Sequence, residues 1–217
     1  MHFFKRLISR HLLSLIMTTI SVAVYAQNID CNGLRNGDLL FVSPSIGNAV
    51  TDVTQGHEGL PIDHVAIVVG CDGNTTLRCV VEAVPEAGVR IQELHSFLLE
   101  HALNTILVGR MTMPFDTVST ISNVMQHIGM PYDSLFLPDN DAVYCSELVS
   151  ICYINSTGNP LFAPIGMTFR NNNGVIPTHW KELYARHNME VPEGLLGTNP
   201  GELSRRREVE IIGTLTP

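Results

Sequence analysis

Residues 64–84 read HVAIVVGCDGNTTLRCVVEAV, and this stretch decides the fold. Two apolar segments rich in β-branched residues, 64–71 and 77–84, flank the turn-forming residues DGN, a pattern typical of a β-hairpin. The first segment begins with His64, an unusual start for an apolar strand, and the second contains Glu82. The sequence therefore predicts an antiparallel pair of strands that carries an imidazole and a carboxylate.

The register of this hairpin decides whether the two groups meet. A turn about Gly73 would place Glu82 directly opposite His64, with both side chains on the same face of the sheet. A carboxylate there would hold the imidazole in one tautomer and stabilise its protonated form. A turn about Thr75 would place Glu86 opposite His64 instead, so Glu86 is the alternative partner. The simpler interpretation is that Glu82 is a solvated strand residue and that His64 is the capped end of its strand.

The rest of the chain alternates short strands and helices. Further strands are predicted at 37–43, 89–94 and 105–111, and helices at 94–103, at 116–129 with Asp116 as N-cap, at 145–153 and at 177–187. The polar segment 191–210 is expected to be loosely ordered and has no assigned role. Together these elements predict one α+β domain over residues 27–217, with a mostly antiparallel sheet packed against helices and a C-terminal extension from about residue 190.

Residues 1–26 are predicted to be a secretory signal peptide. Basic residues precede an apolar run from Leu12 to about Val24, and small residues occupy the first and third positions of the Val24–Ala26 triplet before the expected cleavage point. An uncleaved anchor is the alternative, but the run is shorter than the roughly 20 residues that a spanning helix needs. We therefore expect export to a periplasm or beyond, with no membrane span in the mature chain.

Composition narrows the possible partners. The formal net charge of −8 argues against a nucleic-acid backbone as the partner.

All five cysteines lie in the mature chain, where disulfides can form, and the odd number leaves at least one thiol over or paired between molecules. Cys71 and Cys79 could bridge the hairpin, whereas the pairing of Cys31 and Cys152 stays open. Cys-x-x-Cys and His-x-x-x-His pairs are missing from the sequence, so a zinc site has little support.

Cys145 stands at the front edge of an apolar helix, directly after Tyr144. Unpaired backbone N–H groups and the helix dipole favour a negative charge there, and the thiolate is the nucleophilic form of cysteine. We expect Cys145 to be a free thiol with little packing, and Cys152, two turns along the same face, to be core. Residues seven apart on a helix are too distant for a disulfide, which argues against a bond between the two. A buried structural role for Cys145 is the alternative.

Four motifs in a fixed order resemble a known family. They are DHVAIVV (63–69), VVEAVPEAGV (80–89), GMPYD (129–133) and YCSEL (144–148). Over roughly residues 35 to 180 the chain is similar to the YiiX/YebB-like hydrolases, which are circularly permuted relatives of the NlpC-type cell-wall cysteine peptidases. The resemblance implies a permuted papain-like fold, in which His64 precedes Cys145 along the chain.

The same resemblance implies the roles of the site residues. Cys145 would be the nucleophile, His64 the base, Glu82 the orienting residue, and Tyr144 a site-shaping or oxyanion-supporting residue. The implied reaction is hydrolysis of a peptide or peptidoglycan-fragment amide through a thioester, with no metal or organic cofactor. Lipid acyl transfer or ester hydrolysis on the same fold is one alternative, and a non-catalytic module that binds cell-wall peptides or a partner protein is another. The oligomeric state stays open. In the loop before His64, the residues that could touch substrate are Thr54, His57 and Glu58.

Overall fold

The computed structural model describes residues 27–71 and 78–215. The predicted signal peptide and the predicted DGN turn lie outside the described residues. Within the described ranges, every strand and helix predicted from the sequence is present, with boundaries displaced by at most a few residues.

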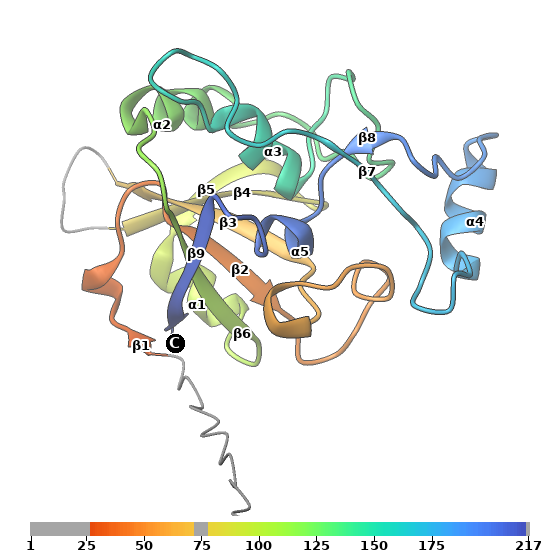
Figure 1. The fold of residues 1–217 in the computed structure, drawn as a ribbon, viewed down its shortest axis with the longest axis horizontal. Coiled ribbons are helices and arrows are strands. Elements are labelled where there is room, and N and C mark those ends of the chain that lie inside the picture. Colours follow the sequence, from red (N-terminus) through yellow and green to blue (C-terminus); the bar gives the residue numbers. More distant parts are fainter. Residues whose placement is uncertain (1–26, 72–77, 216–217) are drawn as a thin grey trace, which may run out of the picture.

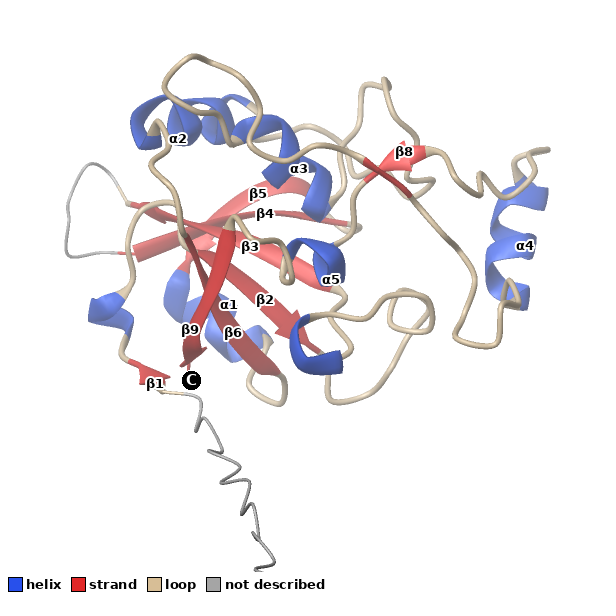
Figure 2. Ribbon diagram, viewed as in Figure 1, coloured by secondary structure: helices blue, strands red, loops and turns tan. Residues whose placement is uncertain are grey.

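The core of the fold is one large sheet. Its strands follow the order β1-β9-β6-β2-β3-β4-β5, and all neighbours are antiparallel except β1 and β9 (Figures 1 and 2). The strands are β1 (Asn28–Ile29), β2 (Leu39–Ser43), β3 (His64–Gly70), β4 (Arg78–Val84), β5 (Gly88–Glu93), β6 (Thr105–Met111) and β9 (Val209–Leu215). A second, two-stranded sheet pairs β7 (Ile165–Gly166) with β8 (Leu196–Gly197).

The helices cover both faces of the large sheet. They are α1 (Leu94–Glu100), α2 (Thr117–Gln126), α3 (Cys145–Cys152), α4 (Thr178–Arg186) and α5 (Pro200–Leu203), with short 3-10 turns at Cys31–Gly33 and His57–Gly59. Figure 2 shows α2 and α3 on one side of the sheet and α1 on the other, with α4 apart from the sheet beyond β7 and β8. As the sequence predicts, Asp116 caps α2 with its carboxylate. Pro177, predicted as the first residue of the last helix, is instead the N-cap residue of α4.

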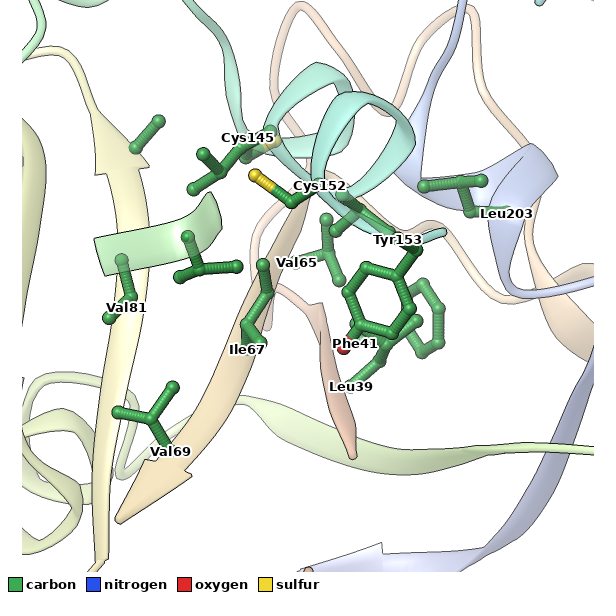
Figure 3. Close-up of a cluster of buried hydrophobic side chains, with 14 of the residues drawn as sticks. Leu39, Phe41, Val65, Ile67, Val69, Val81, Cys145, Cys152, Tyr153 and Leu203 are labelled. Carbon is green, nitrogen blue, oxygen red and sulfur yellow. The ribbon is translucent and has the colours of Figure 1, made fainter. Parts of the chain in front are cut away.

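Alternation along the strands explains the two apolar layers. In β2, Leu39 and Phe41 point into the layer that contains α3, whereas Leu40 and Val42 point into the layer that contains α1. Figure 3 shows the first layer, where Cys145 and Cys152 of α3 lie among side chains of β3 and β4. Because α3 packs on one of these buried faces, its start lies against the strands that carry His64 and Glu82.

The predicted hairpin register is wrong by two residues. Val68 pairs with Val80 and Gly70 with Arg78, and this register, continued to the start of β3, puts Val84 rather than Glu82 opposite His64. The shift is an even number, so His64 and Glu82 keep the same face and become diagonal neighbours. Diagonal partners are still within reach of long side chains.

The prediction of a loosely ordered segment 191–210 is also wrong. It contains β8, α5 and the beginning of β9, and β9 then runs between β1 and β6 in the large sheet. Polar composition misleads here because Leu203 of α5 and Val209 of β9 are buried, although most of their neighbours in sequence are polar. The C-terminal segment is thus an integral part of the sheet.

Candidate active site

Helix α3 begins with an ordered cap. Tyr144 is the N-cap residue, and its backbone N–H donates to the Glu147 carboxylate at 3.4 Å. Burial raises the pKa of Glu147 to about 7, although the hydrogen bond from Tyr144 opposes this shift. Cys145 follows as the first helical residue, so its side chain and backbone N–H both lie at the helix start.

The environment of Cys145 differs in one respect from the prediction. Cys145 is a free thiol, but it is only 4% exposed and belongs to the apolar layer beneath α3. The expectation of little packing is therefore wrong, because the helix lies flat on β3 and β4 from its first turn. Cys152 is fully buried in the same layer, as predicted for a core residue, and burial raises the pKa of its thiol to about 12.

His64 lies beside both Glu82 and Cys145. Its Nε2 lies 2.6 Å from Oε2 of Glu82, and Cys145 is close enough to the ring to affect its pKa. Since Nε2 faces the carboxylate, Nδ1 is the ring nitrogen left for the sulfur. Burial lowers the pKa of His64, but the interactions with Cys145 and Glu82 outweigh burial and raise the pKa to about 10. The ring is thus placed between a carboxylate and a thiol, and its protonated form is favoured.

Glu82 is the most buried charged group of the site, with no exposed surface. Besides His64, its carboxylate accepts hydrogen bonds from Arg90 Nε at 2.9 Å, Arg90 Nη2 at 2.8 Å and Gln92 Nε2 at 2.7 Å. Burial alone would raise the pKa of Glu82, but the hydrogen bonds and charges of His64 and Arg90 lower it to about 2. Glu82 therefore stays ionised at any physiological pH.

The alternative partner, Glu86, does not meet His64. It lies exposed in the turn between β4 and β5, while Glu82 occupies the buried strand position. The geometry thus favours Glu82 over Glu86 as the carboxylate beside the imidazole.

Sequence reasoning missed Arg90 and Gln92. Both lie on β5, where Arg90 pairs with Glu82 and Gln92 with Val80 across the β4–β5 ladder. Arg90 also donates to Glu100 of α1 at 2.6 Å. The alternating polar residues of the segment VRIQEL were a usable signal. Residues two apart in a strand point to the same face of the sheet, so Arg90 and Gln92 share a face, and cross-strand pairing brings that face next to Glu82.

Two tyrosines border the thiol. The hydroxyl of Tyr144 accepts the backbone N–H of Thr198 at 3.1 Å and lies 3.8 Å from the Met167 sulfur. Tyr132, from the GMPYD motif, is half-buried, and its pKa is raised by burial and by the nearby Cys145. Tyr144 is thereby held in place by the segment after β8, which suits a site-shaping residue.

A cavity opens beside Cys145. Its wall includes Thr54 from the loop before His64, but His57 and Glu58 line a different cavity near β9. The remaining wall comes mainly from apolar and aromatic side chains of distant segments, among them Phe136, Met167, Phe169 and Trp180. The thiol thus lies at the border of a largely apolar hollow.

Within the described residues, we find no cluster of three or more His, Cys, Asp or Glu side chains arranged to hold a metal ion. Among the same residues, no helix combines the length and the apolar character of a membrane span.

The sheet, the helix that begins with Cys145 and the order of His64 before Cys145 define a circularly permuted papain-like protein. The chain belongs to the family of permuted papain-like amidases YaeF/YiiX, whose family model matches residues 33–211. Its structure is similar to one described as metalloprotein yiiX from Escherichia coli O157:H7, with a TM-score of 0.67 and 18% identity over 84% of this chain and 98% of that one. No curated protein matches the sequence.

Proposed function

We propose that this chain is an exported cysteine hydrolase that cleaves an amide bond of a peptide or cell-wall fragment through Cys145, His64 and Glu82. The observation that carries the proposal is the placement of the His64 ring, which is hydrogen-bonded to Glu82, next to Cys145 at the border of a cavity. A nucleophile, a base in contact with it and a group that orients the base are the parts that thiol catalysis needs. The membership of a family of amidases supports the reaction class.

The proposed reaction has two stages. His64 takes the thiol proton, and the Cys145 sulfur attacks the carbonyl carbon, so that a C–S bond forms and the carbonyl oxygen becomes an oxyanion. Backbone N–H groups at the start of α3, that of Cys145 among them, stabilise this oxyanion. His64 then gives the proton to the amide nitrogen as the C–N bond breaks. Water, deprotonated by His64, attacks the thioester carbon, releases the acid and restores the thiol.

The proposed export rests on two features of the chain. Residues 1–26 have the sequence pattern of a secretory signal. Cys71 and Cys79 form a disulfide across the β3–β4 hairpin, and disulfides are typical of oxidising compartments. Both features support a periplasmic or extracellular location.

The test is turnover measured beside thermal stability for a small set of variants on a panel of muropeptides and peptide amides. Cys145→Ser, which keeps the size of a buried side chain, and Cys145→Ala should both abolish turnover. His64→Ala should approach the same loss, because nucleophile and base act as a unit. Glu82→Gln should be milder, since the imidazole keeps a hydrogen-bond partner. Full activity of Cys145→Ala, or Glu82→Gln as the most impaired variant, would contradict the proposal.

A further inference from the structure

A second histidine lies against the proposed base. His101 is the C-cap residue of α1, and its ring is stacked on the ring of His64, with 6.0 Å between the ring centroids and 23° between the ring planes. Centroid separations of about 4.5–7 Å are typical of interacting aromatic rings. Helix α1 lies on the opposite side of the sheet from α3 (Figure 2), so the surroundings of His64 draw on both sides of the sheet.

The pleat of β3 explains how the two rings meet. His64 points to the same face as Ala66 and Val68, because residues two apart in a strand share a face. Ala66 and Val68 pack in one buried layer with Phe97 of α1. His101 follows Phe97 by one turn, donates its backbone N–H to the Phe97 carbonyl at 3.1 Å, and has its ring centroid 4.5 Å from that of Phe97. Since Phe97 has no exposed surface, the ring of His101 is held by the core of the domain.

A hydrogen bond fixes the protonation state of His101. The backbone N–H of Ser45 donates to Oδ1 of Asn104 at 3.1 Å, which assigns the oxygen end of this amide. The other end, Nδ2, lies 3.1 Å from Nδ1 of His101. An amide NH2 group only donates, so Nδ1 is the acceptor and the ring hydrogen lies on Nε2. A proton on Nδ1 would bring two donors together, so this bond favours the uncharged ring.

The charges around His101 agree with an uncharged ring. Burial and the nearby His64 lower the pKa of His101, and they outweigh the carboxylates that act in the opposite sense. Two of those carboxylates are already bonded to a guanidinium. The titratable and charged neighbours come from the start of β3, from β4, from β5 and from α1 itself, and they are Asp63, His64, Glu82, Arg90 and Glu100. Of the two stacked imidazoles, His64 is therefore the one that takes a proton.

We infer that His101 is a positioning residue, an uncharged ring that holds the His64 imidazole in the orientation from which it reaches both Glu82 and Cys145. Both nitrogens of His64 point outward in the plane of the ring, so a group stacked on the ring face competes for neither. The same group blocks rotation about the Cβ–Cγ bond, because that rotation would swing the edge of the imidazole into His101. A charged neighbour would instead repel the imidazolium that forms when His64 takes the thiol proton. The role of His101 rests on the proposed function, since it requires His64 to be the base.

Nitrogen NMR of the histidine rings tests the protonation state on the unmodified protein. The imidazolium and the two neutral tautomers differ in the chemical shifts of their ring nitrogens. At pH 6.5, His101 should be mainly the neutral form with its hydrogen on Nε2, while His64 is protonated. A protonated His101, or a hydrogen on Nδ1, would overturn the role of His101, and this result needs no variant that might fail to fold.

Three variants test the effect of the ring on the thiol, with the rate of Cys145 alkylation by iodoacetamide as the readout. His101→Ala should slow Cys145 by about fivefold or more. His101→Phe restores an uncharged ring and should stay within about twofold of the unmodified protein. The pH at which His64 titrates should fall from about 10 in His101→Ala and should not fall in His101→Phe. His95→Ala makes the matched change at an exposed histidine of α1 and should leave the rate unchanged.

The outcomes separate the role of His101 from the proposed function. In the unmodified protein, a Cys145 that reacts no faster than Cys152 would overturn the proposed function, and the role of His101 with it. Three results would overturn the role of His101 alone. They are a fast Cys145 whose rate survives His101→Ala, a His64 titration that does not move in that variant, and an equal loss of rate in His101→Phe.

Discussion

At the scale of single residues, Glu82 constrains the site most strongly. A carboxylate without exposed surface is destabilising by several kcal/mol unless its oxygens are hydrogen-bonded. Here Oε2 accepts from His64, and Oε1 accepts from Arg90 and Gln92. The same bonds that stabilise the buried charge fix the position of the imidazole next to Cys145, so stability and site geometry depend on one network.

This network predicts a pH-dependent contribution to stability. The pKa of His64 is raised from 6.5 to about 10, so its contribution is complete below pH 6.5 and is lost as the pH rises toward 10. The pKa of Glu82 is lowered from 4.5 to about 2, so its contribution is complete above pH 4.5 and is lost as the pH falls toward 2. Glu82→Gln should therefore cost about 3 kcal/mol in the free energy of unfolding between these limits, and less toward pH 9.5 and pH 3.

Urea unfolding of both proteins at a series of pH values measures this difference. Glu86→Gln is the matched control, since the same change at an exposed residue of the β4–β5 turn should have a small effect at every pH. A Glu82→Gln effect that is flat with pH, or no larger than that of Glu86→Gln, would contradict the ionised pair.

At the scale of elements, α3 separates two cysteines with different roles. Its first residue, Cys145, borders the cavity and lies next to His64. Its last residue, Cys152, is fully buried in the core, where its sulfur lies 3.7 Å from Nδ1 of His127. The cap formed by Tyr144 and Glu147 holds the Cys145 end of the helix in place. One short helix thus supplies both the packing surface and the sulfur.

Replacing Cys152 tests this division. Cys152→Ala should lower the free energy of unfolding by about 1–2 kcal/mol, because it leaves a void in a fully buried layer. Cys31→Ala, at the half-buried free cysteine, should lower it by clearly less. Denaturant unfolding of the two variants provides the comparison. Equal losses in the free energy of unfolding would show that Cys152 contributes no more to core packing than Cys31 does.

At the scale of the whole molecule, the C-terminal segment completes the sheet that supports the site. Strand β9 pairs with β6 along its length and with β1 at its end, so residues near both limits of the described chain lie side by side (Figure 1). Gly213, with a φ of 154°, lies at this junction, and a Cβ atom there would come within 1.9 Å of the Gln27 carbonyl oxygen. The junction therefore depends on the missing side chain of one glycine.

Substituting Gly213 tests the packing of β9 against β1. Gly213→Ala should lower the thermal midpoint clearly, because the added methyl group meets backbone that a side-chain rotation cannot move. Gly174→Ala also changes a residue with positive φ but meets nothing within 4 Å, so only the backbone strain of about 1 kcal/mol is expected there. If calorimetry gives equal shifts for the two variants, β9 does not pack against β1 as described.

The sequence carries local information well and distant pairing poorly. The β-branched pattern of 64–71, the cap at Asp116 and the cysteine at the start of α3 are local signals, and each predicted the right element. The face shared by His64 and Glu82 was also predictable, because it depends only on whether the register shift is even. The register itself was not, since it depends on how the turn closes.

The missing parts of the site come from segments far apart in the chain. The side chains that donate to Glu82 lie on β5, not on the two strands that carry His64 and Glu82. The aromatic wall of the Cys145 cavity includes Trp180 of α4. The pairing of β9 with β6 joins strands about 100 residues apart, and no local propensity specifies such a contact. Tertiary packing decides these features, and a single sequence does not display it.

The central claim, that His64 and Cys145 act together, is tested most directly by the alkylation rate of each free thiol with iodoacetamide at pH 6. Cys145 should react at least about tenfold faster than Cys152, whose thiol has a pKa raised to about 12 by burial. His64→Ala should lower the Cys145 rate by about tenfold or more and leave Cys152 unchanged. Equal rates at Cys145 and Cys152 in the unmodified protein, or a Cys145 rate that survives the loss of His64, would contradict the account.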